Sequence, residues 1–261
     1  MPISPNTDPG RYFAEGYCLF RDVLSETEIA ETRAELETMI ANLPERQVVY
    51  KDGQNKEVDA RPEYLTEPHP KHPFWLELCR HPRVLDAVES VLGPDLILIM
   101  SHLIVKRAED GLPVAWHQDN TYWPSVHGTD VATVWLAIDD VDIKNGAMRI
   151  IPRSHTKGIF NHGKSQKVGN LLSVNQEVDE TLLDSDNAVD IELRAGQASL
   201  HDGLTVHGSS PNRSMRRRCG VTIRYITPKV QIHREPNRPF NWCPSVVRGE
   251  DRYQLNEYLP P

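Results

Sequence analysis

The hydrophobic positions in the first third of the chain recur at helical spacing. Between residues 25 and 43 apolar residues return at helical intervals, and Ser25 with Glu28 has the spacing of a capping box. This segment is therefore predicted to be a helix with one face on a core. A helical pair is also predicted within 72–93, where two prolines suit first turns and Gly93 suits the end of the second helix.

From about residue 96 the pattern changes to short runs rich in β-branched residues, and turn residues such as Asn145-Gly146 separate them. The runs predicted as strands are 96–106, 131–138, 147–152, 189–193, 198–201 and 217–227. Several short strands after a helical part favour a β-sandwich or barrel that is backed by helices.

Three stretches show neither the helical nor the strand pattern of hydrophobic residues. Residues 45–70 are polar and broken, and we expect them to form a loop that lies over the functional site. Residues 153–187 form a long polar insertion, and residues 234–248 carry three prolines and are expected to form an irregular cover. The sequence contains no internal repeat and no low-complexity tract.

Composition and charge narrow the function classes. With 39% hydrophobic and 25% charged residues among 261, the chain has an ordinary globular composition and enough length for a well-buried core. The formal net charge of −8 argues against a nucleic-acid partner, and without a long apolar stretch no membrane partner is expected. The four cysteines are widely spaced and no signal segment begins the chain, so we expect reduced thiols and a cytoplasmic location.

Two histidines and one aspartate form the candidate chemistry. Residues i and i+2 of an extended segment share a face, so His117 and Asp119 project together, and His207 follows a β-type run much later. Two imidazoles and one carboxylate can occupy one face of an octahedral metal and leave three positions open, as in non-haem Fe(II) oxygenases. Because the chain has 11 histidines, the spacing alone does not decide, and a zinc hydrolase with these ligand types stays open.

A cluster of arginines follows His207, and strand parity selects one of them. Along the strand predicted there, one face is apolar and the other is polar. The apolar face has Cys219, Val221, Ile223 and Tyr225, and the polar face has Arg218, Gly220, Thr222 and Arg224. If the apolar face packs on the helices, Arg218 is buried near the metal. A dicarboxylate cosubstrate could then supply the anionic partner that a buried guanidinium requires.

Several motifs occur in a fixed order along the chain. The main ones are His117-Gln118-Asp119, His207-Gly208-Ser209, Asn212 and Arg218. Further ones are Leu103–Lys106, Asn145-Gly146, Ile151–His155 with Arg153 at a place where glycine is usual, and His201, six residues before His207. Together they resemble the phytanoyl-CoA dioxygenase family of Fe(II)/2-oxoglutarate oxygenases. The likeness covers roughly residues 10–228.

The resemblance implies a mainly β fold with flanking helices, built on a double-stranded β-helix, the cupin-like jelly roll. Residues 1–261 would form one oxygenase domain. Its expected parts are a helical N-terminal part (about 1–95), a jelly-roll core (96–228, with the insertion 153–187) and a C-terminal cover (229–261).

The resemblance also implies roles for single residues. The expected iron ligands are His117, Asp119 and His207, and Arg218 is expected to bind the distal carboxylate of 2-oxoglutarate. The family positions that help to hold this cosubstrate match Ser209, Trp135 and, more weakly, Gln118. A core aromatic is an equally good explanation of Trp135. His155 and His201 are expected to be structural or loop residues and not ligands.

The implied activity is hydroxylation of an unactivated C–H bond in a small organic substrate, with Fe(II), 2-oxoglutarate and O2, and with release of succinate and CO2. Asp119 favours hydroxylation over chlorination, because related halogenases carry a small residue at that place. Candidate substrate-lining residues are Trp116, Asn120, Tyr122, Trp123, Arg234 and Trp242. A zinc-dependent hydrolase, a catalytically silent metal-binding relative and a homodimeric assembly stay open as alternatives.

Overall fold

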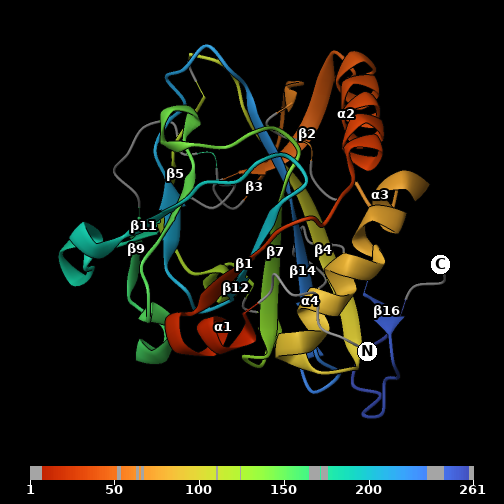
Figure 1. Cartoon of the computed structure of the whole chain (residues 1–261), viewed down its shortest axis with the longest axis vertical. Helices are drawn as coiled ribbons and strands as arrows, with labels where there is room; N and C mark the ends of the chain where they lie inside the picture. The colour runs from red at the N-terminus through yellow and green to blue at the C-terminus, as the bar shows by residue number, and fades with distance from the viewer. Residues whose placement is uncertain are drawn as a thin grey trace.

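Two antiparallel sheets form the centre of the fold in the computed structural model (Figure 1). The structure describes residues 8–51, 54–62, 65, 68–109, 111–123, 125–164, 171, 176–233 and 244–258. The larger sheet contains, in spatial order, β1 (Tyr17–Phe20), β12 (Ala198–Asp202), β7 (Val131–Ala137), β14 (Arg218–Ile226), β4 (Leu96–Lys106) and β16 (Ser245–Arg248). The smaller sheet contains β11 (Val189–Ile191), β8 (Met148–Ile150), β13 (His207–Ser209) and β5 (Val114–His117).

The chain passes back and forth between these sheets. The strands β4, β5, β7 and β8 alternate between the larger and the smaller sheet, and β11, β12, β13 and β14 alternate again. The short strand β6 (Val126–His127) stands apart and pairs with β15 (Gln231–Ile232). This alternation is the path of a double-stranded β-helix, so the predicted jelly-roll core is confirmed.

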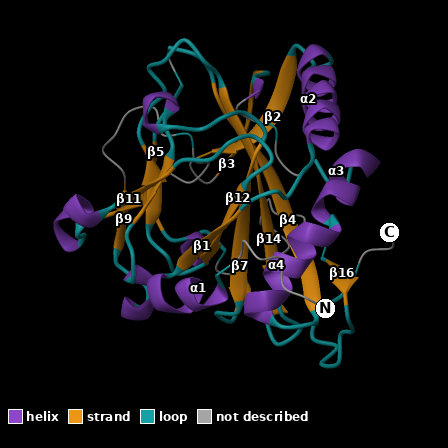
Figure 2. Cartoon of the chain, in the orientation of Figure 1, coloured by secondary structure: helices purple, strands orange, loops and turns teal. Residues whose placement is uncertain are grey.

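Helices cover the outer face of the larger sheet, as Figure 2 shows for α2, α3 and α4. The helices are α1 (Pro9–Glu15), α2 (Glu26–Ala41), α3 (Pro73–Cys79) and α4 (Pro82–Leu92). The predicted capping box is present at the start of α2, where the Glu28 carboxylate accepts from the Ser25 backbone N–H at 2.7 Å. None of the helices in the described ranges is long and apolar enough to span a bilayer.

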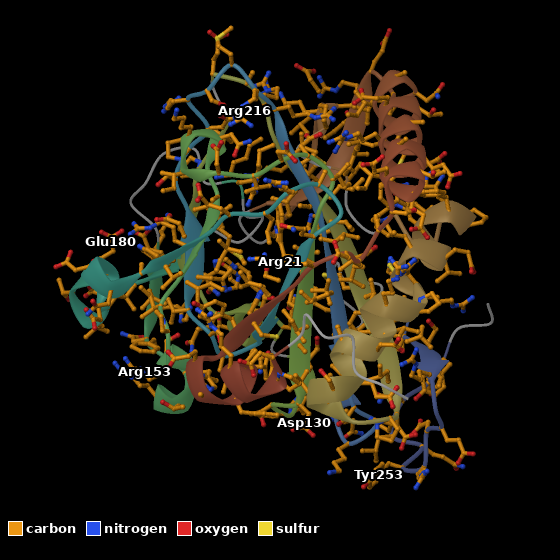
Figure 3. The ribbon with its side chains drawn as sticks, in the orientation of Figure 1. Arg21, Asp130, Arg153, Glu180, Arg216 and Tyr253 are labelled. Atoms are coloured by element: carbon orange, nitrogen blue, oxygen red, sulfur yellow. The ribbon has the colours of Figure 1, made fainter. Side chains whose placement is uncertain are left out.

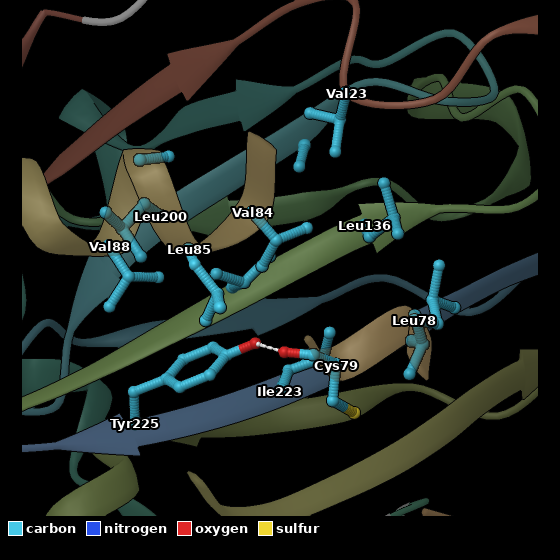
Figure 4. Packing of buried hydrophobic residues seen from close by; sticks show 14 of the residues in the cluster. Val23, Leu78, Cys79, Val84, Leu85, Val88, Leu136, Leu200, Ile223 and Tyr225 are labelled. Atoms are coloured by element: carbon cyan, nitrogen blue, oxygen red, sulfur yellow. Dashed lines mark hydrogen bonds between the residues drawn. The ribbon is translucent and has the colours of Figure 1, made fainter. Parts of the chain in front are cut away.

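The two faces of β14 separate as the sequence pattern predicts. Its apolar side chains are buried with α3 and α4 in the main core cluster (Figure 4). Within that cluster the Tyr225 hydroxyl donates to the carbonyl oxygen of Cys79 at 2.6 Å, which fixes β14 to the end of α3. The opposite face, which begins with Arg218, is therefore directed away from the helices and into the space between the two sheets.

The prediction of a loop over 45–70 is wrong for its first half. Residues Arg46–Lys51 form β2 and residues Gln54–Asp59 form β3, and the two strands pair antiparallel. Val48 is 68% exposed, so this hairpin buries little and shows no apolar face in the sequence. The signal that indicates it is the Asp52-Gly53 dipeptide between the strands, which favours a two-residue hairpin turn.

The irregular cover predicted for 234–248 also needs correction, because its last residues form β16 at the edge of the larger sheet. Residues 234–243 lie outside the described residues. The insertion at 153–187 contains β9 (His162–Lys164) and β10 (Gln176–Val178), which pair with each other. Its apolar residues Phe160, Val178 and Leu183 pack around Trp116 and Val206, so the insertion is anchored to the smaller sheet.

Arg153 has a left-handed backbone conformation, with φ of 63°, on the periphery beside α1 (Figure 3). Only glycine adopts this conformation without steric cost, which explains why glycine is usual at this place in the family motif that residues 151–155 resemble. Its exposed ion pair with Glu15, at 3.8 Å, contributes little.

We therefore expect Arg153→Gly to raise the free energy of unfolding by about 0.5–1 kcal/mol, measured by urea denaturation. The matched control is Arg194→Gly, because Arg194 is exposed and has no positive φ, so this change should lower stability. Equal destabilisation by both substitutions would contradict the role given to the backbone strain.

Candidate metal centre

The two predicted histidine ligands lie opposite each other on neighbouring strands. His117 ends β5 and His207 begins β13, and the antiparallel pairing of these strands places the two residues in register. Asp119 follows β5 at the start of a short 3-10 turn. One donor atom from each of the three residues lies within 4.8 Å of the others, and all three side chains are buried.

Backbone carbonyls fix the tautomer of both rings. The Nδ1 atom of His117 lies 2.8 Å from the Ala115 carbonyl oxygen, and that of His207 lies 2.9 Å from the Thr205 carbonyl oxygen. Because a carbonyl only accepts, each Nδ1 carries the hydrogen and each Nε2 offers a lone pair. Burial, together with the His117 ring, holds the pKa of His207 well below its usual value, so the ring is neutral, as a metal ligand must be.

The two oxygens of Asp119 have different surroundings. Oδ1 lies 3.6 Å from Nε2 of His117 and 3.8 Å from Nε2 of His207. Ligands at right angles on one ion, each about 2.1 Å from it, would lie about 3 Å apart, so a small contraction suffices to seat a metal. Oδ2 instead accepts a hydrogen bond of 2.6 Å from the Thr133 hydroxyl of β7. One oxygen thus faces the centre and the other is held by the protein.

Two side chains that the sequence did not predict at the centre also approach Asp119. Nε2 of His201 and Nε of Arg224 lie 3.6 and 3.7 Å from Oδ2. Burial alone would raise the pKa of Asp119, but Arg224 and the rings of His117 and His201 bring it well below its usual value. Arg224 shares strand parity with Arg218, and that parity was the signal that could have identified it.

Arg218 is a buried cation, and two of its nitrogen atoms lack a hydrogen-bonding partner within the described residues. Its side chain is 2% exposed, and its Nε and Nη1 atoms have no acceptor among the described residues. The guanidinium stacks on the Trp135 ring at 4.4 Å from the centroid. Such orphaned donors are costly unless an anion binds there, so these residues fit the distal carboxylate of a dicarboxylic acid.

Lys106 and Ser209 lie beside Arg218. Lys106 is paired with Arg218 across β4 and β14, and its Nζ donates to the Ser209 hydroxyl at 2.7 Å. Burial and the neighbouring Arg218 lower the pKa of Lys106 well below its usual value. The structure thus brings Arg218, Ser209 and Trp135 together. Trp135 is at once a core aromatic and the stacking partner of the guanidinium.

The expectation for Gln118 needs correction. Its amide nitrogen donates to the carbonyl oxygens of Gly158 and Leu204, and its amide oxygen accepts from the backbone N–H of Phe160. Parity turns this side chain away from the face that His117 and Asp119 share. The side chain therefore ties the insertion to the smaller sheet, and its polar atoms are already used by the protein.

The other arginines that follow His207 are less buried: Arg213 and Arg216 are exposed, and Arg217 is half-buried. Arg216 pairs with Asp142, and Arg217 pairs with Asp139 and Glu37. Figure 3 shows Arg216 at the edge of the molecule. Charged partners already neutralise these side chains, so they do not compete with Arg218 for a buried anion.

The candidate substrate-lining residues separate into different environments. Trp116 packs in the cluster around Val206. Tyr122 meets the His117 ring edge-on at 5.1 Å, and the Trp123 ring lies 5.5 Å from the Arg224 guanidinium carbon. These two aromatic residues therefore border the centre. Arg234 and Trp242 lie outside the described residues.

A double-stranded β-helix that brings together two histidines of neighbouring strands and one carboxylate is typical of the non-haem iron oxygenases. The profile of the family described as phytanoyl-CoA dioxygenase (PhyH) matches residues 12–220, and the chain belongs to this family. The predicted enzyme class, a 2-oxoglutarate-dependent oxygenase with Fe(II), 2-oxoglutarate and O2, is thereby confirmed at the level of the family.

Relatives with known names span most of the chain. A protein of Stutzerimonas stutzeri named a probable alpha-ketoglutarate-dependent hypophosphite dioxygenase is 25% identical, over 82% of this chain and 76% of its own length. The L-proline trans-4-hydroxylase of Streptomyces griseoviridis is 25% identical, over 82% and 84%. A solved structure of ThoJ, a non-heme monooxygenase in its apo form, is 30% identical, covers 97% of this chain and 87% of that chain, and has a TM-score of 0.74.

Gly220 gives a test of the stacking between Trp135 and Arg218. A Cβ atom at Gly220 would lie 2.4 Å from two ring carbons of Trp135, so Gly220→Ala must displace the indole. Since cation–π stacking contributes about 0.5–2 kcal/mol, we expect 2-oxoglutarate affinity to fall roughly three- to thirtyfold in an anaerobic titration. The control is Gly163→Ala, where nothing lies within 4 Å of the added carbon. Unchanged cosubstrate affinity in a folded Gly220→Ala protein would remove Trp135 from this role.

Proposed function

We propose that the protein is an Fe(II)/2-oxoglutarate-dependent hydroxylase of a small organic substrate, which releases succinate and CO2. Two features carry this proposal together: the buried Arg218 guanidinium, whose Nε and Nη1 atoms lack an acceptor among the described residues, and the three convergent metal-ligand side chains. The predicted single domain of residues 1–261 is part of the same proposal.

Each site residue has a distinct task in this proposal. His117, Asp119 and His207 would hold the iron through two imidazole Nε2 atoms and one carboxylate oxygen. Arg218 would bind the distal carboxylate of 2-oxoglutarate, with Trp135 below its guanidinium and Ser209 oriented by Lys106. The bound iron with 2-oxoglutarate supplies the activation of O2 for attack on a C–H bond.

The Asp119 carboxylate favours hydroxylation over chlorination. It fills the position that resembling halogenases leave open for chloride, and Thr133 holds its second oxygen in place. A displacement of Asp119 from the metal would therefore have to break a buried hydrogen bond.

The two alternatives leave Arg218 unexplained. A zinc hydrolase needs the triad and a water molecule, but it has no use for a buried guanidinium without a partner. A silent relative would lose nothing by replacing this arginine with an apolar residue, and such a replacement would remove an unpaired buried charge. A free, small substrate is supported by the relatives named for L-proline and for hypophosphite. The homodimer stays a prediction.

The most direct test is succinate formation from 2-oxoglutarate by the purified protein. We expect it to require Fe(II) and O2 together, and to fail when Zn(II) replaces iron, because zinc has no redox chemistry. Turnover of a hydrolysable substrate by the zinc-loaded protein, together with no succinate from the iron-loaded protein, would instead favour the hydrolase.

We also expect Arg218→Ala to weaken 2-oxoglutarate binding by about tenfold or more, because each charge-assisted hydrogen bond contributes roughly 1.5–3 kcal/mol. Iron affinity should change far less, since Arg218 does not contact the triad. Anaerobic titration with each ligand separates the two effects. The control is Arg213→Ala, which removes an exposed arginine from the loop that precedes β14. Equal cosubstrate affinity in the Arg218 and Arg213 variants would refute this assignment.

A further inference from the structure

The buried charges of the described chain are unequal in sign. Four buried residues carry a formal charge, and only one of them is an acid: Lys106, Asp119, Arg218 and Arg224. Lys106 is paired with Arg218 on neighbouring strands, and Nε of Arg224 lies 3.7 Å from Oδ2 of Asp119. Three cations and one carboxylate thus share the space between the sheets, so the site as a whole attracts anions.

The ligands of the proposed function do not neutralise this excess. Ferrous iron and the two guanidiniums would carry four positive charges, and the two carboxylates of 2-oxoglutarate with Asp119 would carry three negative ones, so one positive charge is left even without Lys106. Arg218 is satisfied by the distal carboxylate, and Lys106 already donates to Ser209 and to the Ser210 carbonyl oxygen. The remaining guanidinium, that of Arg224, has the Asp119 carboxylate 3.7 Å away but shares it with the proposed metal, so among the described residues it has no anion to itself.

Arg224 is placed for a ligand other than the distal end of the cosubstrate. Six residues along one strand separate its Cα atom from that of Arg218 by about 20 Å, so the two side chains serve opposite ends of the site. The Arg224 side chain is 9% exposed, its Nη1 donates to the Thr222 hydroxyl, and its Nε has no hydrogen-bond acceptor in the described part of the chain. At 3.7 Å the Asp119 oxygen is close enough to attract it but too far for a hydrogen bond.

Aromatic side chains border this guanidinium. The Trp123 ring lies 5.5 Å from its central carbon, and Tyr122 lies edge-on to the ligand His117. Both aromatic residues belong to one apolar cluster with Met100. A small molecule at this place would have an anion-binding group at one end and an apolar wall along its carbon skeleton, next to the metal.

We infer that Arg224 binds an anionic group of the primary substrate, so that the substrate is a small organic molecule with a carboxylate or a phosphonate. The planar guanidinium offers such an oxyanion two parallel hydrogen bonds. The same contact would hold the substrate beside Asp119 and thereby orient one C–H bond toward the metal. This inference rests on the proposed function, because it takes 2-oxoglutarate as the ligand of Arg218.

Small anions test the inference without knowledge of the substrate. The anaerobic protein with Fe(II) and 2-oxoglutarate, in chloride-free buffer, has a weak charge-transfer band that reports on the coordination sphere. We expect acetate or methylphosphonate to shift this band at millimolar concentrations. The neutral analogues, acetamide and dimethyl methylphosphonate, should not shift it. The two anions distinguish a carboxylate site from a phosphonate site.

Variants assign the effect to one side chain. Arg224→Gln should weaken anion binding at least tenfold, because it removes a charge-assisted interaction, and Arg224→Lys should retain part of it. Arg216→Gln is the matched control and should bind the anions as the unaltered protein does, since Arg216 is exposed and paired with Asp142. Arg218→Gln should instead lose affinity for 2-oxoglutarate.

Three results would overturn the inference. The first is a band that forms but responds to neither anion, and the second is equal anion affinity in the Arg224→Gln and Arg216→Gln proteins. The third is a loss of 2-oxoglutarate affinity in Arg224→Gln as large as its loss of anion affinity, which would assign Arg224 to the metal-bound end of the cosubstrate. Failure of the band to form in the unaltered protein would contradict the proposed function itself, so the two failures are distinguishable.

Discussion

The centre depends on the interactions of the buried Asp119 carboxylate with the groups around it. Asp119 is the one buried acid in the described part of the chain, and cationic or hydrogen-bonding groups approach it on both sides. A buried carboxylate without such partners would be costly, and so would the buried guanidinium of Arg224 without Asp119. Thr133 fixes the orientation of the carboxylate, which leaves one oxygen directed at His117 and His207. The charge balance of the protein and its capacity to hold a metal thus depend on the same side chain.

Strand alternation explains how the chain separates its core from this polar centre. On β14 the residues that face α3 and α4 are apolar, and those that face the smaller sheet include Arg218 and Arg224. One strand therefore stabilises the fold with one face and supplies both guanidiniums with the other. The smaller sheet contributes the histidines, because the pairing of β13 with β5 brings His207 opposite His117. The site lies between the two sheets and not on a loop.

Local pattern was enough to predict α2, α3 and α4, most strands of the larger sheet and the burial of Arg218, but it did not predict α1. Side-chain parity carries that information, and it needs no knowledge of distant contacts. The pairing of His207 with His117, which lie 90 residues apart in the sequence, is a non-local event that no local period encodes. The resemblance to a family supplied it instead. The approach of His201 to Asp119 is also non-local, because β12 of the larger sheet carries His201 and Asp119 follows β5 of the smaller sheet. The exposed hairpin of β2 and β3 buries too little to leave an apolar pattern. Gln118 was assigned by resemblance although its parity points away from the metal ligands.

A crystal structure of the protein prepared anaerobically with Fe(II) and 2-oxoglutarate tests the central claim most directly. The account predicts one ion at about 2.1 Å from Nε2 of His117, Nε2 of His207 and a single oxygen of Asp119. It also predicts the distal carboxylate of 2-oxoglutarate on the Arg218 guanidinium. An ion bound elsewhere, or a carboxylate that leaves the Arg218 donors without an acceptor, would contradict it.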